Sequence, residues 1–323
     1  MHKDYIYFQL PTQQDIINAE SRISRFIHKT PILSSATLNE IAGCELYFKC
    51  ENFQKVGAFK SRGAMNAVLS IPEFQLRHGV CTHSSGNHAQ ALARAASLKN
   101  VPAYIVMPSN APKVKIEAVK SYGGQITFCE PNLQARETTL AQVQNLTGAT
   151  EIHPYDNLKV IEGQATVALE LLQQVENPDF ILTPVGGGGL LSGVSIATSY
   201  FSPLTKVIAA EPLGASDAFE SFYSKKYVPS LNPHTIADGL LTSLGKYTFP
   251  IILKYVSQVI TVDEIQIIEA LKLIYQRLKI VVEPSSAVVL AAVLSNKQLF
   301  SNKRVVLVIS GGNVDFDTLK RIL

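Results

Sequence analysis

Stretches typical of buried strands alternate with stretches typical of helices along almost the whole chain. Seven strand candidates lie at residues 45–50, 79–83, 103–108, 125–130, 180–185, 206–211 and 304–310. Most of them are continuous apolar runs with β-branched residues, as in strands covered on both faces. Helical patterns separate them: apolar residues recur at helical spacing after Asp263, a plausible N-cap, and the run 287–294 predicts a buried helix. This alternation predicts an α/β protein with parallel sheets and right-handed crossovers.

The chain is long enough for two domains. It has 323 residues, and a domain typically takes about 100–200 residues. Residues 82–150 hold strand–helix units joined by short connections, which favours a small domain inserted into a larger one. We therefore predict a large domain of residues 1–81 and 151–323 and a small domain of residues 82–150.

Composition and charge exclude several classes of protein. Hydrophobic residues make up 46% and charged residues 17%, as in compact globular chains rather than disordered ones. The formal net charge is only +3 and the basic residues are spread out, so we expect no nucleic-acid partner. No apolar run reaches the roughly 18 residues of a membrane span, so we expect no membrane partner.

The N-terminus and the cysteines indicate a cytoplasmic location. Residues 1–14 contain no apolar segment typical of a secretory signal. Cys44, Cys50, Cys81 and Cys129 form no Cys-x-x-Cys pair, so neither a zinc ribbon nor a redox dithiol is indicated. We expect small buried thiols in a reducing compartment.

Ligands of parallel α/β proteins bind at the carboxyl ends of strands, and four loops at such positions carry unusual residues. The first loop runs from Gly57 to Gly63 and places Lys60 at the start of a helix, where cations are disfavoured. From the residues alone, two interpretations stay open. Lys60 could be an ordinary solvated lysine, or it could form a Schiff base with an aldehyde cofactor, its pKa lowered by burial and by the helix N-terminus.

The second loop, His83 to His88, follows a strand and precedes an alanine-rich helix. Its small polar residues, together with the backbone N–H groups of the helix N-terminus, suit a cradle for a carboxylate. Simple helix capping by serine and asparagine is the structural alternative. A zinc site is not expected, because His78, His83 and His88 do not share one helix face.

The third loop is the run of four glycines from Gly186 to Gly189, between a strand and a helix. A backbone without side chains can wrap closely around an anion such as a phosphate, and the helix dipole adds attraction. A competing interpretation is a dinucleotide fingerprint with Glu211 closing the next strand, but Ser192 replaces its third glycine. A nucleotide-binding regulator built on this loop is the rival from another functional class.

The fourth loop begins with Ser310 directly after a strand, and two glycines follow it. A serine hydroxyl beside glycines can approach a flat heterocycle closely. Together, the four loops offer a Schiff-base lysine, a carboxylate cradle, a phosphate cup and a hydroxyl for a ring nitrogen. This combination is typical of pyridoxal phosphate (PLP) bound to an amino-acid substrate.

Several motifs occur in the order and spacing of a known family. They are His28-Lys29-Thr30-Pro31, Glu51-Asn52-Phe53-Gln54-Lys55 leading to Lys60, Ser84-Ser85-Gly86-Asn87-His88, the four glycines, Glu283-Pro284-Ser285 and Ser310-Gly311-Gly312-Asn313. On these motifs the chain resembles, over nearly its whole length, the fold-type II PLP enzymes of the serine/threonine dehydratase and serine racemase group. The resemblance implies two open, mostly parallel, twisted sheets with flanking helices.

The resemblance also implies roles for individual residues. Lys60 would carry the cofactor and move the Cα proton on one face of the substrate. Cofactor contacts are implied for Asn87 at the ring hydroxyl, for Ser310 at the pyridine nitrogen, and for Gly186, Gly187, Gly188 and Gly189 at the phosphate. Substrate contacts are implied for Ser84, Ser85, Asn87, His88, Arg136 and Ser243.

Ser85 bears most directly on the reaction. Threonine dehydratases of the group generally carry alanine at this position, whereas in its serine racemases a serine hydroxyl faces the side of the substrate opposite the lysine. Racemisation needs an acid/base group on each face, so we expect interconversion of L- and D-serine, with dehydration of serine to pyruvate and ammonia alongside. Related threo-3-hydroxyaspartate dehydratases also carry this serine, so a dehydratase for threonine, serine or hydroxyaspartate is the alternative.

The resemblance further implies a metal, an effector and a partner. Glu211, Ala215 and Asp217 match a divalent-metal site, and two carboxylates with a carbonyl and waters suit Mg²⁺, Ca²⁺ or Mn²⁺. The nucleotide site of some animal racemases is matched at Ser35, Lys55, Gln90, Tyr122 and Asn313 but not at Ala36, Thr37 and Val56. ATP is therefore retained as a candidate effector, and a homodimer is expected.

Overall fold

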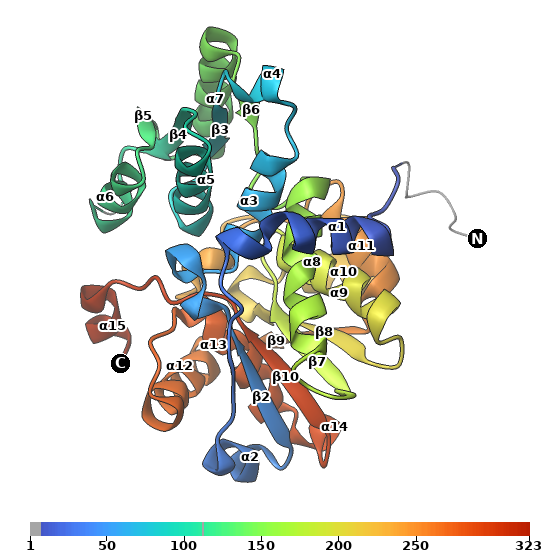
Figure 1. The fold of residues 1–323 in the computed structure, drawn as a ribbon. Coiled ribbons are helices and arrows are strands. Elements are labelled where there is room, and N and C mark those ends of the chain that lie inside the picture. The colour runs from blue at the N-terminus through green and yellow to red at the C-terminus, as the bar shows by residue number, and fades with distance from the viewer. Residues whose placement is uncertain (1–7, 112) are drawn as a thin grey trace.

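Two sheets with flanking helices make up the computed structural model, which describes residues 8–111 and 113–323. The smaller sheet lies above the larger one in Figure 1. Residues 1–7, on which the expectation of no secretory signal partly rests, lie outside the described residues. Within the described ranges, no helix combines the length and apolar character needed to cross a membrane. The predicted fold of two mostly parallel sheets with flanking helices is confirmed.

The larger sheet has six strands in the order β1-β2-β10-β7-β8-β9. Only the β1–β2 pair is antiparallel among these described strands. The strands are β1 (Ile32–Leu33), β2 (Glu45–Cys50), β7 (Phe180–Pro184), β8 (Lys206–Pro212), β9 (Gln258–Val262) and β10 (Arg304–Ile309). The carboxyl ends of β2 and β10 point toward the smaller sheet in Figure 1.

The smaller sheet has four parallel strands in the order β5-β4-β3-β6. They are β3 (Val80–His83), β4 (Ala103–Pro108), β5 (Gln125–Cys129) and β6 (Thr150–Glu151). Strands β3 and β6 each cross a predicted domain boundary. The division into domains of residues 1–81 with 151–323 and of residues 82–150 stays a prediction.

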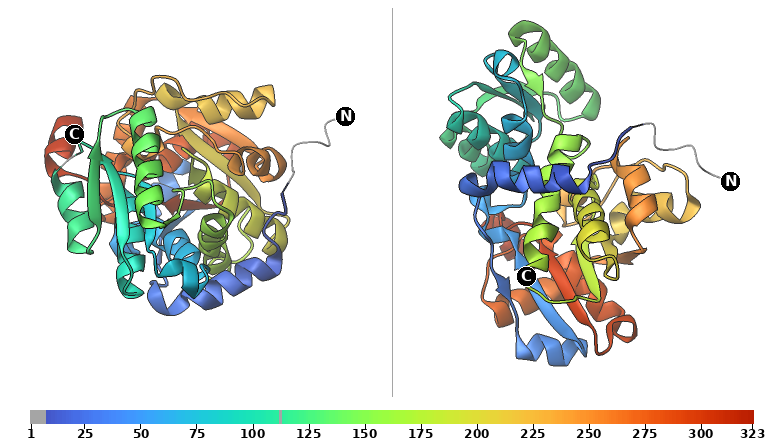
Figure 2. Two further views of the ribbon diagram at one scale, coloured as in Figure 1. Left: turned by 90° about the horizontal axis from the view of Figure 1, so that it is seen from above. Right: turned by 45° about the vertical axis from the view of Figure 1, so that its right-hand side comes forward.

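Helices cover both faces of each sheet. One face of the larger sheet packs against α2, α12 and α13 and the other mainly against α8, α9 and α11, while the smaller sheet lies between α5 and α7. Figure 2 shows α8 and α9 side by side. The helices are α1 (Gln13–Ile23), α2 (Ala36–Ala42), α3 (Lys60–Leu69), α4 (Glu73–Leu76), α5 (Asn87–Leu98), α6 (Lys113–Ser121), α7 (Leu133–Thr147), α8 (Leu158–Leu172), α9 (Gly189–Phe201), α10 (Asp217–Ser224), α11 (Thr248–Tyr255), α12 (Glu264–Leu273), α13 (Pro284–Ser295), α14 (Lys297–Phe300) and α15 (Phe316–Ile322).

Local signals in the sequence explain where two of these helices begin. The Asp263 side chain accepts a hydrogen bond from the Gln266 amide, and the Gln266 side chain accepts one from the Asp263 amide, so a capping box opens α12 as predicted. The α-helical part ends at Leu273, earlier than the apolar pattern indicated, and a π-helical turn follows it. Proline at the first position opens α13. Of the run 287–294 predicted to be buried, residues 287–293 are at most 1% exposed and Leu294 is partly buried.

Helix α3 occupies the position that matters most for the site. It packs against α8 beside the larger sheet and against α5 beside the smaller sheet.

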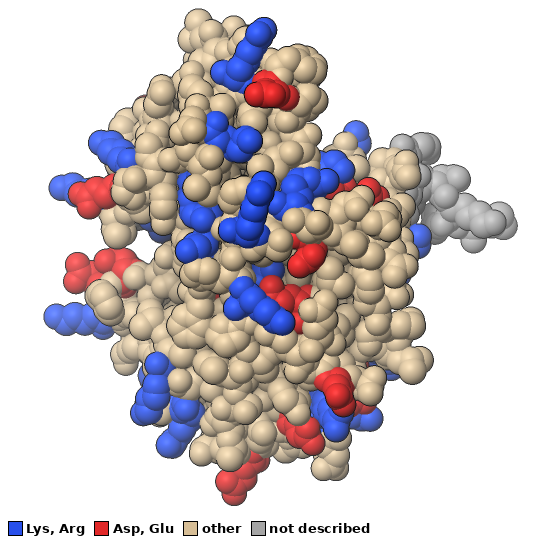
Figure 3. Space-filling model, viewed as in Figure 1, with Lys and Arg blue, Asp and Glu red and all other residues tan. Residues whose placement is uncertain are grey.

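Lysine and arginine side chains are interspersed with acidic ones over the face seen in Figure 3. Of the four cysteines, Cys44, Cys50 and Cys81 are buried as expected, whereas Cys129 is half-buried.

Candidate active site

Lys60 is the first residue of α3, directly after the segment that links β2 to this helix. Its Nζ donates a hydrogen bond to the Pro154 carbonyl oxygen at 2.6 Å and lies 5.2 Å from the centroid of the Phe59 ring. Burial disfavours the ammonium form and lowers the pKa of Lys60 to about 8, although the Glu283 carboxylate opposes this effect. Such an amine is more often neutral near pH 7 than a solvated lysine, which favours the Schiff-base interpretation.

The four glycines form a closely walled turn between β7 and α9. All four are buried, and Gly188 has φ of +84°, a conformation that favours glycine. A Cβ atom on Gly187 would lie 2.3 Å from the Tyr155 ring, and one on Gly186 would lie 2.9 Å from the Leu240 Cα. Only glycine therefore fits this turn, which presents backbone N–H groups at the N-terminus of α9, as an anion-binding loop does.

The predicted carboxylate loop joins β3 to α5. The Gly86 amide donates to Ser84 Oγ at 3.4 Å, and Asn87 is the first residue of the helix. A Cβ atom on Gly86 would meet no other atom within 4 Å, so the space beside this residue of the loop is open. Ser84 and Ser85, both partly exposed, therefore border open space at a helix N-terminus.

His88 is held in one tautomer at the same helix end. Its Nε2–H donates to the Ile152 carbonyl oxygen at 2.9 Å, which leaves Nδ1 as an acceptor that is buried without a partner. Burial, reinforced by the charge of Lys60, lowers the pKa of His88 to about 3. The ring is therefore neutral at physiological pH and offers an unused acceptor.

Asn87 lies in a chain of hydrogen bonds that fixes its amide orientation. Its Nδ2 donates to both Glu283 carboxylate oxygens at 3.1 and 3.2 Å, and its Oδ1 accepts from Asn313 Nδ2 at 2.8 Å. Burial raises the pKa of Glu283 to about 7. The Glu283-Pro284-Ser285 motif is visible in the sequence, but the site role of Glu283 is not apparent from it.

Ser310 lies next to the loop that carries Lys60. Its backbone carbonyl accepts a hydrogen bond from the Phe59 amide at 3.0 Å, and Ala58 forms a β-bridge with Gly311. The Ser310 hydroxyl is buried and lies 3.0 Å from Ser286 Oγ. The structure thus brings the first and fourth predicted loops together.

The segment from His153 to Asp156 joins these parts, although no sequence motif identified it. The Pro154 carbonyl binds Lys60, and the Tyr155 ring covers Gly187. The Asp156 carboxylate accepts hydrogen bonds from the Lys246 and Tyr247 amides, at the start of α11. His153 Nδ1 accepts from the Asp156 amide at 2.9 Å. A short polar run directly after β6 is the one signal that could have indicated the segment.

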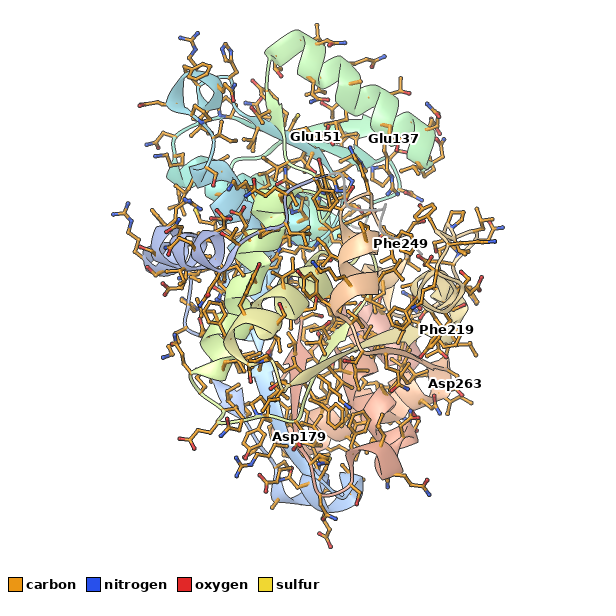
Figure 4. All side chains as sticks on the ribbon, turned by 90° about the vertical axis from the view of Figure 1, so that its right-hand side faces the viewer. Glu137, Glu151, Asp179, Phe219, Phe249 and Asp263 are labelled. Carbon is orange, nitrogen blue, oxygen red and sulfur yellow. The ribbon has the colours of Figure 1, made fainter. Side chains whose placement is uncertain are left out.

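The two weaker site predictions, Arg136 and Ser243, lie in different surroundings. Arg136, on α7, lies near His83, where burial and the Arg136 charge together lower the histidine pKa, and the Arg136 Nε is buried without a partner. The His83 ring centroid is 6.1 Å from that of His153. Ser243 instead accepts a hydrogen bond from the Ser230 amide at 2.8 Å. Figure 4 shows Glu137, the neighbour of Arg136, together with Glu151 in the smaller-sheet part.

The predicted metal residues lie at the end of β8 and the start of α10. The two Glu211 carboxylate oxygens accept hydrogen bonds from the Ala218 and Phe219 amides at 2.8 and 2.7 Å, and Figure 4 labels Phe219. Asp217 Oδ2 is buried without a partner. Burial raises the pKa of Glu211 to about 9 and of Asp217 to about 6.

These neighbouring buried carboxyls have unused acceptor capacity, which fits a hard divalent cation that keeps several waters. Ala215 is buried in the turn between them. Among the described residues, no group of three or more His, Cys, Asp or Glu side chains could hold a metal ion. A cation at this position would therefore depend on carbonyl oxygens and water as well as on the two carboxylates.

Comparisons with known proteins agree with this geometry. Residues 23–311 match the family model described as "Pyridoxal-phosphate dependent enzyme". The chain is 52% identical over 319 residues to a serine racemase of Dictyostelium discoideum, covering 97% of this chain and 98% of that protein. It is 48% identical over 310 residues to a beta-hydroxyaspartate dehydratase of Paracoccus denitrificans, covering 96% of this chain and 98% of the relative. The solved structure of maize serine racemase has a TM-score of 0.94 and 44% identity, with 97% of each chain covered.

The fold and the sequence comparisons lead to the same assignment. The matched segment spans the loops that carry Lys60, Asn87 and the four glycines. The relatives are similar to this chain over nearly its full length, so the likeness is not confined to one of the two sheets. The chain belongs to the family of pyridoxal-phosphate-dependent enzymes that includes the serine racemases.

Proposed function

We propose that this enzyme is a serine racemase that interconverts L- and D-serine and also dehydrates serine to pyruvate and ammonia. The observation that carries the proposal is the buried Lys60 amine, with its pKa lowered to about 8, beside the carboxylate loop and the glycine turn. Pro154 and Tyr155 connect this amine to the glycine turn, and Glu283 connects it to Asn87. The 52% identity to a serine racemase supports the substrate assignment.

Lys60 holds and moves the Cα proton in this proposal. Bound PLP supplies an electron sink for the electron pair left when the Cα–H bond breaks. With a pKa of about 8, roughly one Lys60 amine in ten is neutral at pH 7 and able to accept a proton. The Pro154 carbonyl gives the amine a hydrogen-bond partner.

Ser85 supplies the second acid/base group. In a racemase, one group removes the proton from one face of the substrate and another returns it on the opposite face. The Ser85 side chain belongs to the loop that also contains Gly86, beside which the space is open. The substrate carboxylate would bind in this loop to the Ser84 hydroxyl and to the amides at the N-terminus of α5, which also orients Cα.

Asn87 and Ser310 would hold the flat ring of the cofactor. The bonds from Asn87 to Asn313 and Glu283 fix its amide, so that a ring hydroxyl meets a preoriented group. The Ser310 hydroxyl suits a neutral pyridine nitrogen, because a serine cannot keep that nitrogen protonated as a carboxylate would. Bound in this way, the cofactor would be a weaker electron sink, which favours loss of a β-hydroxyl over transamination.

A hydroxyaspartate dehydratase is the second candidate function. The 48% identity to a beta-hydroxyaspartate dehydratase favours it specifically. The cationic Arg136 near His83 could also attract a second substrate carboxylate. This candidate differs from the first in requiring no return of the proton on the opposite face.

A divalent cation, Mg²⁺ or alternatively Ca²⁺ or Mn²⁺, completes the proposal. The unpartnered Asp217 Oδ2 and the buried Glu211 carboxylate would hold it together with the backbone at Ala215. Its charge would compensate two neighbouring buried carboxylates and stabilise the start of α10. The residue set for ATP is incomplete, so ATP stays a candidate effector without a step of its own.

We also propose that the enzyme acts in the cytoplasm as a homodimer with a large and a small domain. Exposed apolar side chains around the C-terminal helix support self-association, because Val281, Phe316 and Leu323 are 52%, 76% and 50% exposed beside a cavity of about 570 Å³. Sedimentation velocity of the purified protein tests this, and a monomer at micromolar concentration would contradict it.

The reaction itself is tested with purified enzyme, PLP and Mg²⁺. L-serine and threo-3-hydroxyaspartate are supplied separately, and D-serine, pyruvate and ammonia are followed with time. We expect D-serine and pyruvate from L-serine, and neither from the Lys60→Ala variant. Pyruvate without D-serine, together with faster turnover of hydroxyaspartate, would replace the first candidate function by the second.

A further inference from the structure

Four charged side chains meet inside the protein below the start of α3. Lys49 and Glu51 come from the end of β2 and the turn after it, Arg62 from α3, and Glu170 from α8. Lys49, Glu51 and Arg62 have no exposed side-chain surface, and that of Glu170 is 13% exposed. We call these four residues the buried charge network; it contains two positive and two negative charges and is neutral as a whole.

Arg62 makes the largest set of directed bonds in this network. Its Nε and Nη2 donate to the two Glu51 carboxylate oxygens, each at 2.7 Å, in a bidentate pair. Its Nη1 donates to Glu170 Oε2 at 3.1 Å and to Thr166 Oγ1 at 3.3 Å. A planar guanidinium bonded on three sides has one orientation, so Arg62 joins α3 to β2 and to α8 at the same time.

Lys49 occupies the opposite end of the network. Its Nζ bonds Glu170, the Thr30 carbonyl at 2.9 Å and Gln174 Oε1 at 2.8 Å. It therefore ties β2 to α8 and to the segment before β1, and none of these three hydrogen bonds goes to α3. Lys49 is equally buried and equally charged, and so it provides a matched control for Arg62.

The first turn of α3 also lies directly against α8. A Cβ atom on Gly163 would lie 2.6 Å from the Arg62 carbonyl oxygen, and one on Gly63 would lie 2.3 Å from Gln164 Nε2. Because these two glycines lack a Cβ, the first turn of α3 packs directly against α8, and the two helices cannot come closer. The ion pair with Glu51 ties α3 to the turn after β2, while the ion pair with Glu170 and this backbone contact both tie it to α8, so the helix has little freedom to shift.

Arg62 lies only two residues after Lys60 on the same helical turn. Two residues correspond to a rotation of about 200° and a rise of about 3 Å, so their side chains leave the helix on opposite sides. Lys60 points to Pro154 and Arg62 points to Glu51 and Glu170. A shift of α3 within the network would therefore move the Lys60 amine by a similar distance.

Stability alone gives little reason for such a network. Taking four charges out of water is costly, and apolar replacement of a buried ion pair is often neutral or favourable. A precise, rigid orientation is what the charged groups provide and an apolar core would not. We propose that Arg62 is a positioning residue: through Glu51 and Glu170 it fixes the first turn of α3 and thereby the location of the Lys60 amine.

This inference rests on the proposed role of Lys60 as the residue that binds PLP, and the test separates the two. The variants are Arg62→Met, Arg62→Lys, Glu51→Gln and the control Lys49→Met. For each, PLP is added to the apoenzyme, and the rate of Schiff-base formation is followed by its visible absorption. Melting temperature, kcat and KM are measured on the reconstituted enzyme. Borohydride reduction and peptide mapping of the wild type identify the modified lysine.

For Arg62→Met we expect Schiff-base formation at least about tenfold slower and kcat lower by about 10²-fold, as for a reacting group displaced by about 1 Å, with KM little changed. Arg62→Lys should recover part of the rate, because it keeps the charge but loses the bidentate geometry. Lys49→Met should lower the melting temperature by about as much as Arg62→Met does, but its rate of Schiff-base formation should stay near that of the wild type.

Equal effects of Arg62→Met and Lys49→Met on every measurement would overturn the inference, since both would then be simple losses of a buried charge. If Arg62→Met does not fold, Arg62→Lys and Glu51→Gln decide, and wild-type rates of Schiff-base formation in both would overturn it. Borohydride label on a lysine other than Lys60 would instead refute the proposed function. Label on Lys60 with unchanged rates in the variants would refute only the role of Arg62.

Discussion

Gly187→Ala gives the sharpest steric test of the glycine turn. The added Cβ would lie 2.3 Å from Tyr155 Cδ1, about 1.1 Å closer than the 3.4 Å of ordinary contact. Gly187 does not have positive φ, so alanine brings no backbone strain at this position. Gly189 also lies close to the start of the Tyr155 side chain, because a Cβ placed on Gly189 would lie 2.8 Å from Tyr155 Cβ. Either the Tyr155 ring or the glycine turn must therefore shift.

Overpacking of this kind typically costs about 1–3 kcal/mol. If that cost falls on cofactor binding, the Kd for PLP rises by about 5- to 150-fold, at 1.4 kcal/mol per tenfold. Fluorescence titration of the apoenzyme with PLP measures the change. The double variant Gly187→Ala/Tyr155→Ala should regain part of the affinity that Gly187→Ala loses, since the clashing ring is gone.

Gly43→Ala serves as the control, because Gly43 has φ of +70° but open space around it. It should lower the melting temperature slightly through backbone strain and leave the affinity for PLP unchanged. A Kd for Gly187→Ala within twofold of wild type would refute the steric reasoning. A double variant as weak as Gly187→Ala would show that Tyr155 is not the obstructing group.

Three further predictions address the proton transfers and the metal. Ser85→Ala should abolish D-serine formation but spare pyruvate formation from L-serine, measured on the same samples; equal loss of both would contradict a proton donor on the second face. Because burial lowers the pKa of Lys60 to about 8, the neutral amine becomes more abundant as pH rises, so kcat should increase up to about pH 8 and then level off; a profile flat between pH 6 and 9 would contradict this role. Mg²⁺ should raise the melting temperature of the wild type and not that of Glu211→Gln, as binding to the folded state alone requires; equal shifts in scanning calorimetry would place the ion elsewhere.

Much of the fold follows from the apolar pattern. Parallel strands covered on both faces are continuously apolar, so all seven stretches predicted from that property contain strands. The three further strands lack this signal for different reasons. β1 and β6 are only two residues long, and β9 pairs at the edge of its sheet, where half-buried Gln258 and Thr261 interrupt the apolar run.

The candidate site was less accessible from the sequence. The four loops could be predicted because parallel strands end at one edge of a sheet and place their following loops together. Pro154 takes part through its backbone carbonyl, which leaves no trace in side-chain chemistry. Asn87 is 196 residues away from its partner Glu283, and Glu170 is 108 residues away from its partner Arg62, so only the fold shows that each lies next to its partner. Glu51 is nearer to Arg62 in sequence, but no sequence pattern pairs the two.

The most direct test of the central claim uses L-serine and the purified holoenzyme in D₂O. Chiral chromatography coupled to mass spectrometry measures D-serine and its deuterium content at Cα. Proton removal by Lys60 and return from the opposite face predicts D-serine that carries deuterium, with pyruvate formed alongside. Pyruvate without any D-serine would contradict the account and leave a dehydratase in which Ser85 serves only to bind the substrate.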